Sequence, residues 1–220
     1  MADPPKRGWL LRRAENALRR GFQRAYETVR VDPQHYLSHL QAAHRLPVSS
    51  FQQMDSLPME LLDELAAQTI RAGMKMAAVE GAGLGLAGLV TLLPDLSILA
   101  AITLRTVQKL SLIYGFEYNT EEEVAELWVA AASAAGVDIG RELVERQVVK
   151  KFVPRVIERI AARASVEVVE KWSARVIPLV SSLLGAGLNY YFVRAWGERA
   201  RNHFRERHLL LRRQRALPAG

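Results

Sequence analysis

The chain has 220 residues, of which 50% are hydrophobic and 24% are charged, a composition that excludes an intrinsically disordered protein and suits one folded domain. It has no cysteine, which excludes disulfides, thiolate nucleophiles and cysteine-ligated metal centres. The net charge of +7 is uneven, since residues 1–30 carry +5, residues 194–220 carry +6 and the segment between them carries −4. Such cationic ends are typical of proteins that contact nucleic acid, anionic lipid or an acidic protein.

Residues 9–30 are predicted to form a basic amphipathic helix, because apolar residues recur at helical spacing and arginines fill the other positions. One interpretation is a helix that lies on an anionic membrane, with its apolar stripe among the headgroups. The other is a helix docked on the core of its own protein with its arginines in water, which is the more common arrangement in globular proteins. The candidate membrane-surface residues are Trp9, Arg12, Arg13, Arg19, Arg20 and Arg24. Because arginines interrupt every apolar segment here, no secretory signal is predicted, and we expect a cytoplasmic protein, peripheral to the inner face of the membrane.

The next elements are also predicted to be helical. An Asp-Pro pair predicts a short helix near 34–44, followed by a connector rich in serine and proline. A long helix begins just after Ser56 and is ended or sharply kinked at Pro94. A second apolar helix is expected from about residue 95 to Tyr114, with Gly115 as its C-terminal residue.

Glycines are concentrated in the apolar stretch EGAGLGLAGLVTLLPDL. Gly81, Gly85 and Gly88 share one helix face, and Gly185 begins a similar small-residue set later in the chain. Each glycine weakens a helix by about 1 kcal/mol, so we expect these faces to allow close approach of another helix or of an acyl chain. Residues 81–94 and 176–193 carry no charge over fourteen and eighteen positions. Buried core helices are the favoured interpretation of both, and membrane insertion is the alternative.

In the second half, NTEEEVAELW predicts a helix start at residue 120, with Asn119 or Thr120 as the cap. The helix is expected to break near Gly136, and another to run from 138 with a bend near Pro154. A further helix is expected at 165–176, and Pro178 opens the last one. The sequence therefore predicts an all-α fold, a single compact domain of about seven or eight helices with the glycine-rich hairpin in its core. Residues 1–56 form a basic helix and connector, 57–207 the helical domain, and 208–220 a basic tail.

Two stretches, LLPDLSILAAITLRTVQKLSLIYGFE and RVIPLVSSLLGAGLNYYFVRAWGERA, resemble the EcsC family of bacterial proteins. The resemblance covers roughly residues 60–205, and the basic first helix and the end of the arginine-rich tail lie outside it. It implies a compact helical domain that associates with membranes or with membrane transport systems. It implies no established enzymatic activity and brings no catalytic residues to this chain.

Polar residues in apolar surroundings are the remaining candidates for a site. Glu80, Asp95, Arg105 and Asn189 are predicted to form a buried polar cluster, either a structural ion-pair network or a small site for a lipid headgroup. His35 and His39 have the i, i+4 spacing of metal ligands but lack a third ligand, so no metal site is predicted. No catalytic residue and no cofactor is predicted, because the sequence has neither a nucleophile elbow nor a phosphate-binding loop.

These patterns favour a non-catalytic, peripheral membrane or lipid-interacting protein that binds an anionic surface through its basic ends, with an apolar ligand in a groove between the glycine-rich helices. The first alternative is an interaction module for an acidic protein partner. An enzyme that acts on a lipid-like substrate is a further alternative. Nucleic acid is disfavoured as a partner, because no known binding motif accompanies the charge. An enclosed apolar cavity beside the polar cluster would favour a lipid ligand, and dense packing there would favour the interaction module.

Overall fold

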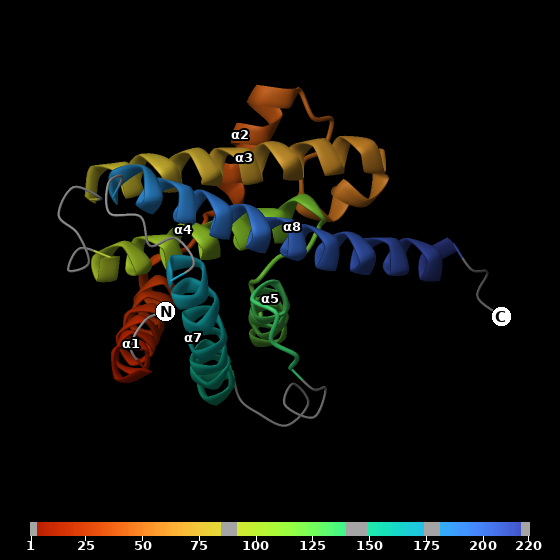
Figure 1. Ribbon diagram of the computed structural model, residues 1–220. Coiled ribbons are helices and arrows are strands. Elements are labelled where there is room, and N and C mark those ends of the chain that lie inside the picture. Colours follow the sequence, from red (N-terminus) through yellow and green to blue (C-terminus); the bar gives the residue numbers. More distant parts are fainter. Residues whose placement is uncertain (1–3, 85–91, 140–148, 174–180, 217–220) are drawn as a thin grey trace.

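The computed structural model describes residues 4–84, 92–139, 149–173 and 181–216. These residues form seven α-helices and one 3-10 helix and include no strand, which confirms the all-α fold (Figure 1). The elements are α1 (Pro4–Thr28), α2 (Pro33–His44), η1 (Phe51–Ser56), α3 (Met59–Leu84), α4 (Leu92–Ile113), α5 (Glu121–Ala134), α7 (Val149–Ser173) and α8 (Ser181–Ala216).

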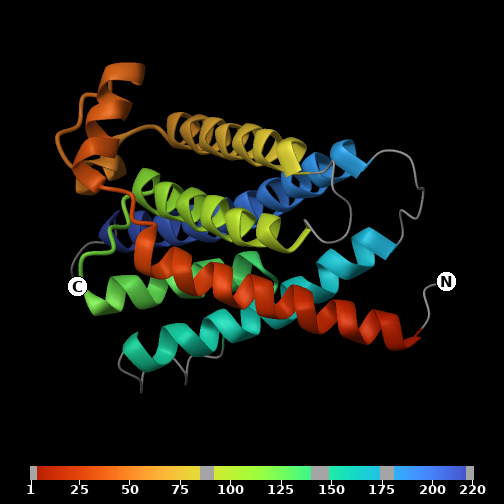
Figure 2. The ribbon, with the colours of Figure 1, turned by 90° about the vertical axis from the view of Figure 1, so that its left-hand side faces the viewer.

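The six long helices lie in two layers (Figures 1 and 2). Helices α3, α4 and α8 form one layer, in which α3 and α8 run antiparallel, and α1, α7 and α5 cross beneath them. Helix α4 contacts α1, α3, α5 and α8 and so lies at the centre of the molecule. The central position of α4 explains why its sequence is apolar around most of its circumference.

The helix ends that carry strong local signals in the sequence lie where the sequence predicts them. Asp32 caps α2 by accepting a hydrogen bond from the backbone N–H of His35 at 2.8 Å. Thr120 and Glu123 form a capping box at the start of α5. Gly115 and Gly136 have φ angles of +82° and +73°, the left-handed conformation that glycine adopts most easily after a helix.

Three of the predicted elements differ from the structure. The connector after α2 contains the 3-10 helix η1, and α4 begins at Leu92, so Pro94 lies in its first turn, where proline is tolerated. Helix α7 continues through Ser165, whose hydroxyl donates to the backbone carbonyl of Ala162 at 2.8 Å, so one helix replaces the predicted two. Helix α8 is continuous to Ala216, so the expected boundary at residue 207 falls inside it.

Close approach of helices does occur at glycines, but at positions that the sequence interpretation missed. A Cβ atom on Gly21 would lie 2.8 Å from the Cα of Ser97, and one on Gly73 would lie 2.7 Å from the hydroxyl oxygen of Thr106. These contacts join α1 and α3 to α4. Of the predicted glycines, Gly81 and Gly185 lie in α3 and α8, within the parts whose side-chain surroundings the structure leaves undescribed, and Gly85 and Gly88 lie outside the described residues.

We expect Gly21→Ala to lower the free energy of unfolding by about 2 kcal/mol, because the added methyl group meets backbone that cannot move without separating α1 from α4. Gly8 is the matched control, since it lies in the same helix and a Cβ there meets nothing within 4 Å. Gly8→Ala should leave stability unchanged or raise it by up to about 1 kcal/mol. Urea denaturation measures both, and equal stabilities for the two variants would contradict the close contact at Gly21.

Candidate functional site

The apolar stripe of α1 is buried in the protein. Ala14, Ala17, Leu18, Phe22 and Ala25 are each exposed by 3% or less, against α4 and α7. Of the two interpretations of this helix, the structure shows the one in which it is docked on its own core. The stripe is therefore not available to enter a membrane, and the alternative in which it lies among the headgroups is excluded for this folded state.

The opposite face of α1 is cationic. Arg12, Arg13, Arg20 and Arg24 are exposed, and we call them the arginine face. No ion pair joins them to any carboxylate among the described residues. Their charges are therefore open to an external anion.

Two further candidate residues lie beside the arginine face. Arg19 is partly buried and donates to the side-chain oxygen of Asn16 at 3.3 Å. Trp9, near the start of α1, is 49% exposed, and the guanidinium of Arg13 lies 4.6 Å from the centre of its ring. An exposed tryptophan beside arginines is typical of side chains that contact the membrane–water interface.

Buried polar contacts hold the C-terminal end of α1 in place. The side chain of Gln108 on α4 accepts from the backbone N–H of Val31 and donates to the carbonyl of Val29, each at 2.9 Å. The hydroxyl of Tyr118 donates to the carbonyl of Val31 at 2.8 Å. These bonds satisfy the backbone after α1, so the arginine face is carried on a fixed helix. No motif in the sequence identifies Gln108 for this role.

The second cationic end is largely neutralised by the protein itself. Arg205 donates to both carboxylate oxygens of Asp63, at 3.1 and 2.9 Å, and Arg212 lies 3.1 Å from Asp55. Arg215 also contacts Asp55, and the other ion pairs of this end are Arg199–Glu167, Arg201–Glu198 and Arg207–Glu126. The described part of the basic tail at 208–220 is therefore held against the protein, because Arg212 and Arg215 of α8 contact Asp55.

His208 is buried in this contact. Its Nδ1–H donates to the backbone carbonyl of Tyr114 at 2.8 Å, and its Nε2 lies 3.7 Å from the Asp55 carboxylate. Burial lowers the pKa of His208, and the neighbouring Arg212 acts in the same direction, against the hydrogen bond to Tyr114. The folded protein therefore holds this imidazole neutral at pH values where the unfolded chain is already protonated.

We expect acid to weaken the fold through this residue. Because the folded pKa lies below the ordinary value of 6.5, the stabilisation is complete above pH 6.5 and is lost as the pH falls below it. His208→Gln retains a side-chain N–H donor but does not titrate, so its melting temperature should fall less than that of the wild type between pH 7.5 and pH 5. Equal slopes in thermal melts across this range would show that His208 does not contribute. His203, whose pKa is also lowered by burial, accounts for part of the remaining slope.

The predicted polar cluster does not form as a buried unit. Asn189 is buried, but Arg105 is exposed on α4. The pKa of the neighbouring Lys109 is lowered, first by the partial burial of Lys109 and second by the charge of Arg105. The side chains of Glu80 and Asp95 lie outside the described part of the structure. Arg105 lies on the exposed side of α4 together with the partly exposed Ala101 and Lys109, and its ten-residue spacing from Asp95 does not reveal this exposure.

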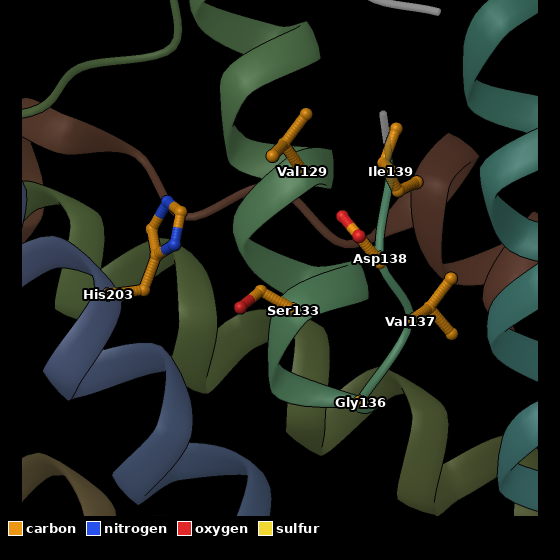
Figure 3. Close-up of a pocket in the computed structure, with 7 residues that line it drawn as sticks. All are labelled: Val129, Ser133, Gly136, Val137, Asp138, Ile139 and His203. Atoms are coloured by element: carbon orange, nitrogen blue, oxygen red, sulfur yellow. The ribbon is translucent and has the colours of Figure 1, made fainter. Parts of the chain in front are cut away.

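An open pocket of about 420 Å³ lies at the C-terminal end of α5 (Figure 3). Its lining includes Ser133, Asp138 and His203, the residue types of a hydrolytic triad, between apolar side chains. No hydrogen bond joins these three side chains in the described structure, so the pocket lacks an activated nucleophile. Among the described residues no group of three metal-binding side chains is present, and His35 and His39 are exposed on α2.

The core between α1, α4, α7 and α8 is densely packed. The cavity lined by Phe22, Leu99, Val168 and Trp196 has a volume of about 10 Å³, too small for a lipid chain. Residues Leu96–Ile113 of α4 are long and apolar enough to cross a membrane, but 72% of that stretch is buried inside the protein. The described core therefore holds no ligand groove at this position.

Comparison with known proteins places the chain among relatives. The family model of the EcsC protein family matches residues 14–209, so the match includes most of α1, beyond the expected 60–205. Protein EcsC of Bacillus subtilis (strain 168) is 30% identical over 154 residues, which are 68% of this chain and 64% of that relative. The chain thus matches less than two thirds of the length of that relative. No solved structure matches it significantly.

Proposed function

This chain belongs to the EcsC protein family, and we propose that it is a non-catalytic, peripheral membrane protein that binds the anionic inner surface of a bacterial membrane through α1. The proposal rests on one observation above all, the four exposed arginines of the arginine face, which have no carboxylate partner among the described residues. Four unpaired guanidinium groups on one helix form a concentrated positive surface, and anionic headgroups are its natural ligand.

The contrast with α8 supports this assignment. Both ends of the chain are rich in arginine, yet Arg205, Arg212 and their neighbours on α8 are paired with Asp63, Asp55 and other carboxylates of the body. The acidic body could neutralise one basic end and does so at α8, whereas α1 keeps its charge exposed. Because its apolar stripe is buried, α1 would bind by electrostatic attraction and by Trp9 at its edge, not by inserting as a free amphipathic helix.

Flotation of the purified protein with liposomes tests the proposal. We expect co-flotation with vesicles that contain phosphatidylglycerol at low salt, little with pure phosphatidylcholine, and release as sodium chloride rises to 1 M, where the Debye length falls to about 3 Å. A protein that floats with neither vesicle type would contradict membrane binding. The arginine face would then be assigned to an acidic protein partner, with the immobilised wild-type protein as the bait for it and the arginine-to-glutamine variant as the control.

The apolar groove expected between the glycine-rich helices falls largely on residues outside the described part of the structure, so the lipid-ligand part of the expectation stays untested. The space between α1, α4, α7 and α8 is too small for a ligand, and the open pocket near His203 has no hydrogen-bonded nucleophile and base. We therefore limit the proposal to surface binding.

A further inference from the structure

Three large apolar side chains are exposed near one end of the α3–α8 pair. Met76 is 45% exposed, Val79 73% and Tyr190 42%, and we call these residues the apolar end. A Cβ on Gly73 would lie 3.1 Å from Val193, which fixes the register of the antiparallel helices. Met76 follows Gly73 by three residues and Tyr190 precedes Val193 by three, so the two lie at the same level along the pair.

The apolar end is accompanied by cations. Lys75 on α3 and Arg194 on α8 are exposed, and neither is joined by an ion pair to another residue that the structure describes. Protein surfaces at the membrane interface typically combine exposed aliphatic side chains with tyrosine, lysine and arginine. The cations there contact lipid phosphate, and the apolar groups reach the acyl chains.

The apolar end lies on the same side of the molecule as the start of α1. The C-terminal end of α3, the N-terminal end of α8 and the N-terminal end of α1 are together on the left in Figure 1 and on the right in Figure 2. Trp9, 49% exposed, belongs to that part of α1. The helix ends that carry Trp9 and the apolar end therefore lie on one side of the molecule, α1 in the lower layer and α3 and α8 in the upper one.

We propose that the apolar end enters the headgroup and acyl boundary of an anionic bilayer while the arginine face binds headgroups, so that the protein binds in a single orientation. This inference rests on the proposed membrane binding and adds to it the second contact. Charges on the single helix α1 leave the protein free to tilt about that helix on the membrane surface, and a second contact away from α1 removes this freedom. Insertion of Val79 and Met76 supplies the direction.

A single fluorescent label tests the orientation, and the cysteine-free chain makes the labelling specific. Val79→Cys is labelled with the environment-sensitive dye NBD, and Leu210→Cys, at a 56% exposed site far along α8, is the matched control. Thermal melts establish that both labelled variants fold. On phosphatidylglycerol vesicles we expect a blue shift and an intensity rise at position 79, with quenching by lipids brominated in the acyl chains, and no change at position 210.

The outcomes separate this inference from the proposed function. If both labelled proteins float with anionic vesicles but neither label responds, membrane binding stands and the insertion of the apolar end is wrong. An equal response of both labels contradicts a single orientation. Failure to float removes membrane binding and the inference with it. A response at position 79 to soluble poly-glutamate but not to vesicles would assign the apolar end to an acidic protein and overturn the proposal.

Discussion

Changing Arg12, Arg13, Arg20 and Arg24 together to glutamine is expected to lower the partition of the protein onto anionic vesicles by roughly a thousand-fold. Each basic residue near an anionic surface contributes about 1 kcal/mol of binding free energy, so four contribute about 4 kcal/mol. The fold should be unaffected, because these side chains are exposed and have no ion-pair partner in the described structure. Vesicle sedimentation over a range of lipid concentrations measures the partition coefficient.

The matched control removes the same charge from elsewhere. The control variant changes four other arginines to glutamine, namely Arg71, Arg201, Arg207 and Arg213. The first three pair with carboxylates of the protein in exposed or half-exposed positions, and Arg213 is exposed. Such pairs contribute little to stability, so this variant should also fold. We expect its vesicle binding to fall far less than that of the first variant. An equal loss in both variants would mean that net charge, and not the arginine face, determines binding.

Phe22→Ala is expected to lower the free energy of unfolding by about 3–5 kcal/mol, a large part of the 5–15 kcal/mol that stabilises most domains. Phe22 is 2% exposed, and its ring stacks on Trp196 at 5.8 Å and meets Trp128 edge-on at 6.5 Å. The substitution leaves a cavity where α1, α5 and α8 meet. Chemical denaturation followed by tryptophan fluorescence measures the loss, since both indoles face the ring.

Tyr26→Ala is the control for Phe22, because Tyr26 lies one helical turn further along α1 and also contacts Trp128, at 5.7 Å, but is 39% exposed. We expect a much smaller loss of stability for it. At a temperature where the Phe22→Ala protein is still folded, the vesicle binding of the Phe22→Ala protein should equal that of the wild type, since its arginine face is intact. Equal destabilisation by the two substitutions would show that α1 is not anchored at Phe22.

The sequence predicts the helices well where their ends carry local chemistry. Asp32 before α2, Thr120 with Glu123 before α5, and Gly115 and Gly136 at helix ends act within a few residues of the backbone groups they satisfy. The prediction at Pro94 is wrong because proline breaks a helix in its interior but is tolerated in a first turn, and the local sequence does not distinguish the two positions.

Which arginines of the candidate site are free to bind a partner depends on ion pairs between distant residues, and local sequence patterns do not predict these pairs. Arg212 meets Asp55, 157 residues earlier, and Arg205 meets Asp63, 142 residues earlier. Counting charges by segment therefore predicts two cationic ends, although pairing across the described part of the fold neutralises most of the second one. Similarly, Gly21 is a contact point because α1 crosses α4 there, whereas glycine clustering directed attention to Gly81, Gly85 and Gly88.

The position of α8 has a consequence for how the chain folds during its synthesis. Phe192, Trp196, Ala200 and Phe204 of this helix are almost fully buried against α3, α4 and α5. Until the ribosome has produced residues 181–216, the apolar surfaces that α8 covers on those helices have no partner, although α4 can already pack on α1 and α3. The nascent chain therefore exposes part of its apolar surface until α8 emerges, and this core is complete only after α8 has been translated.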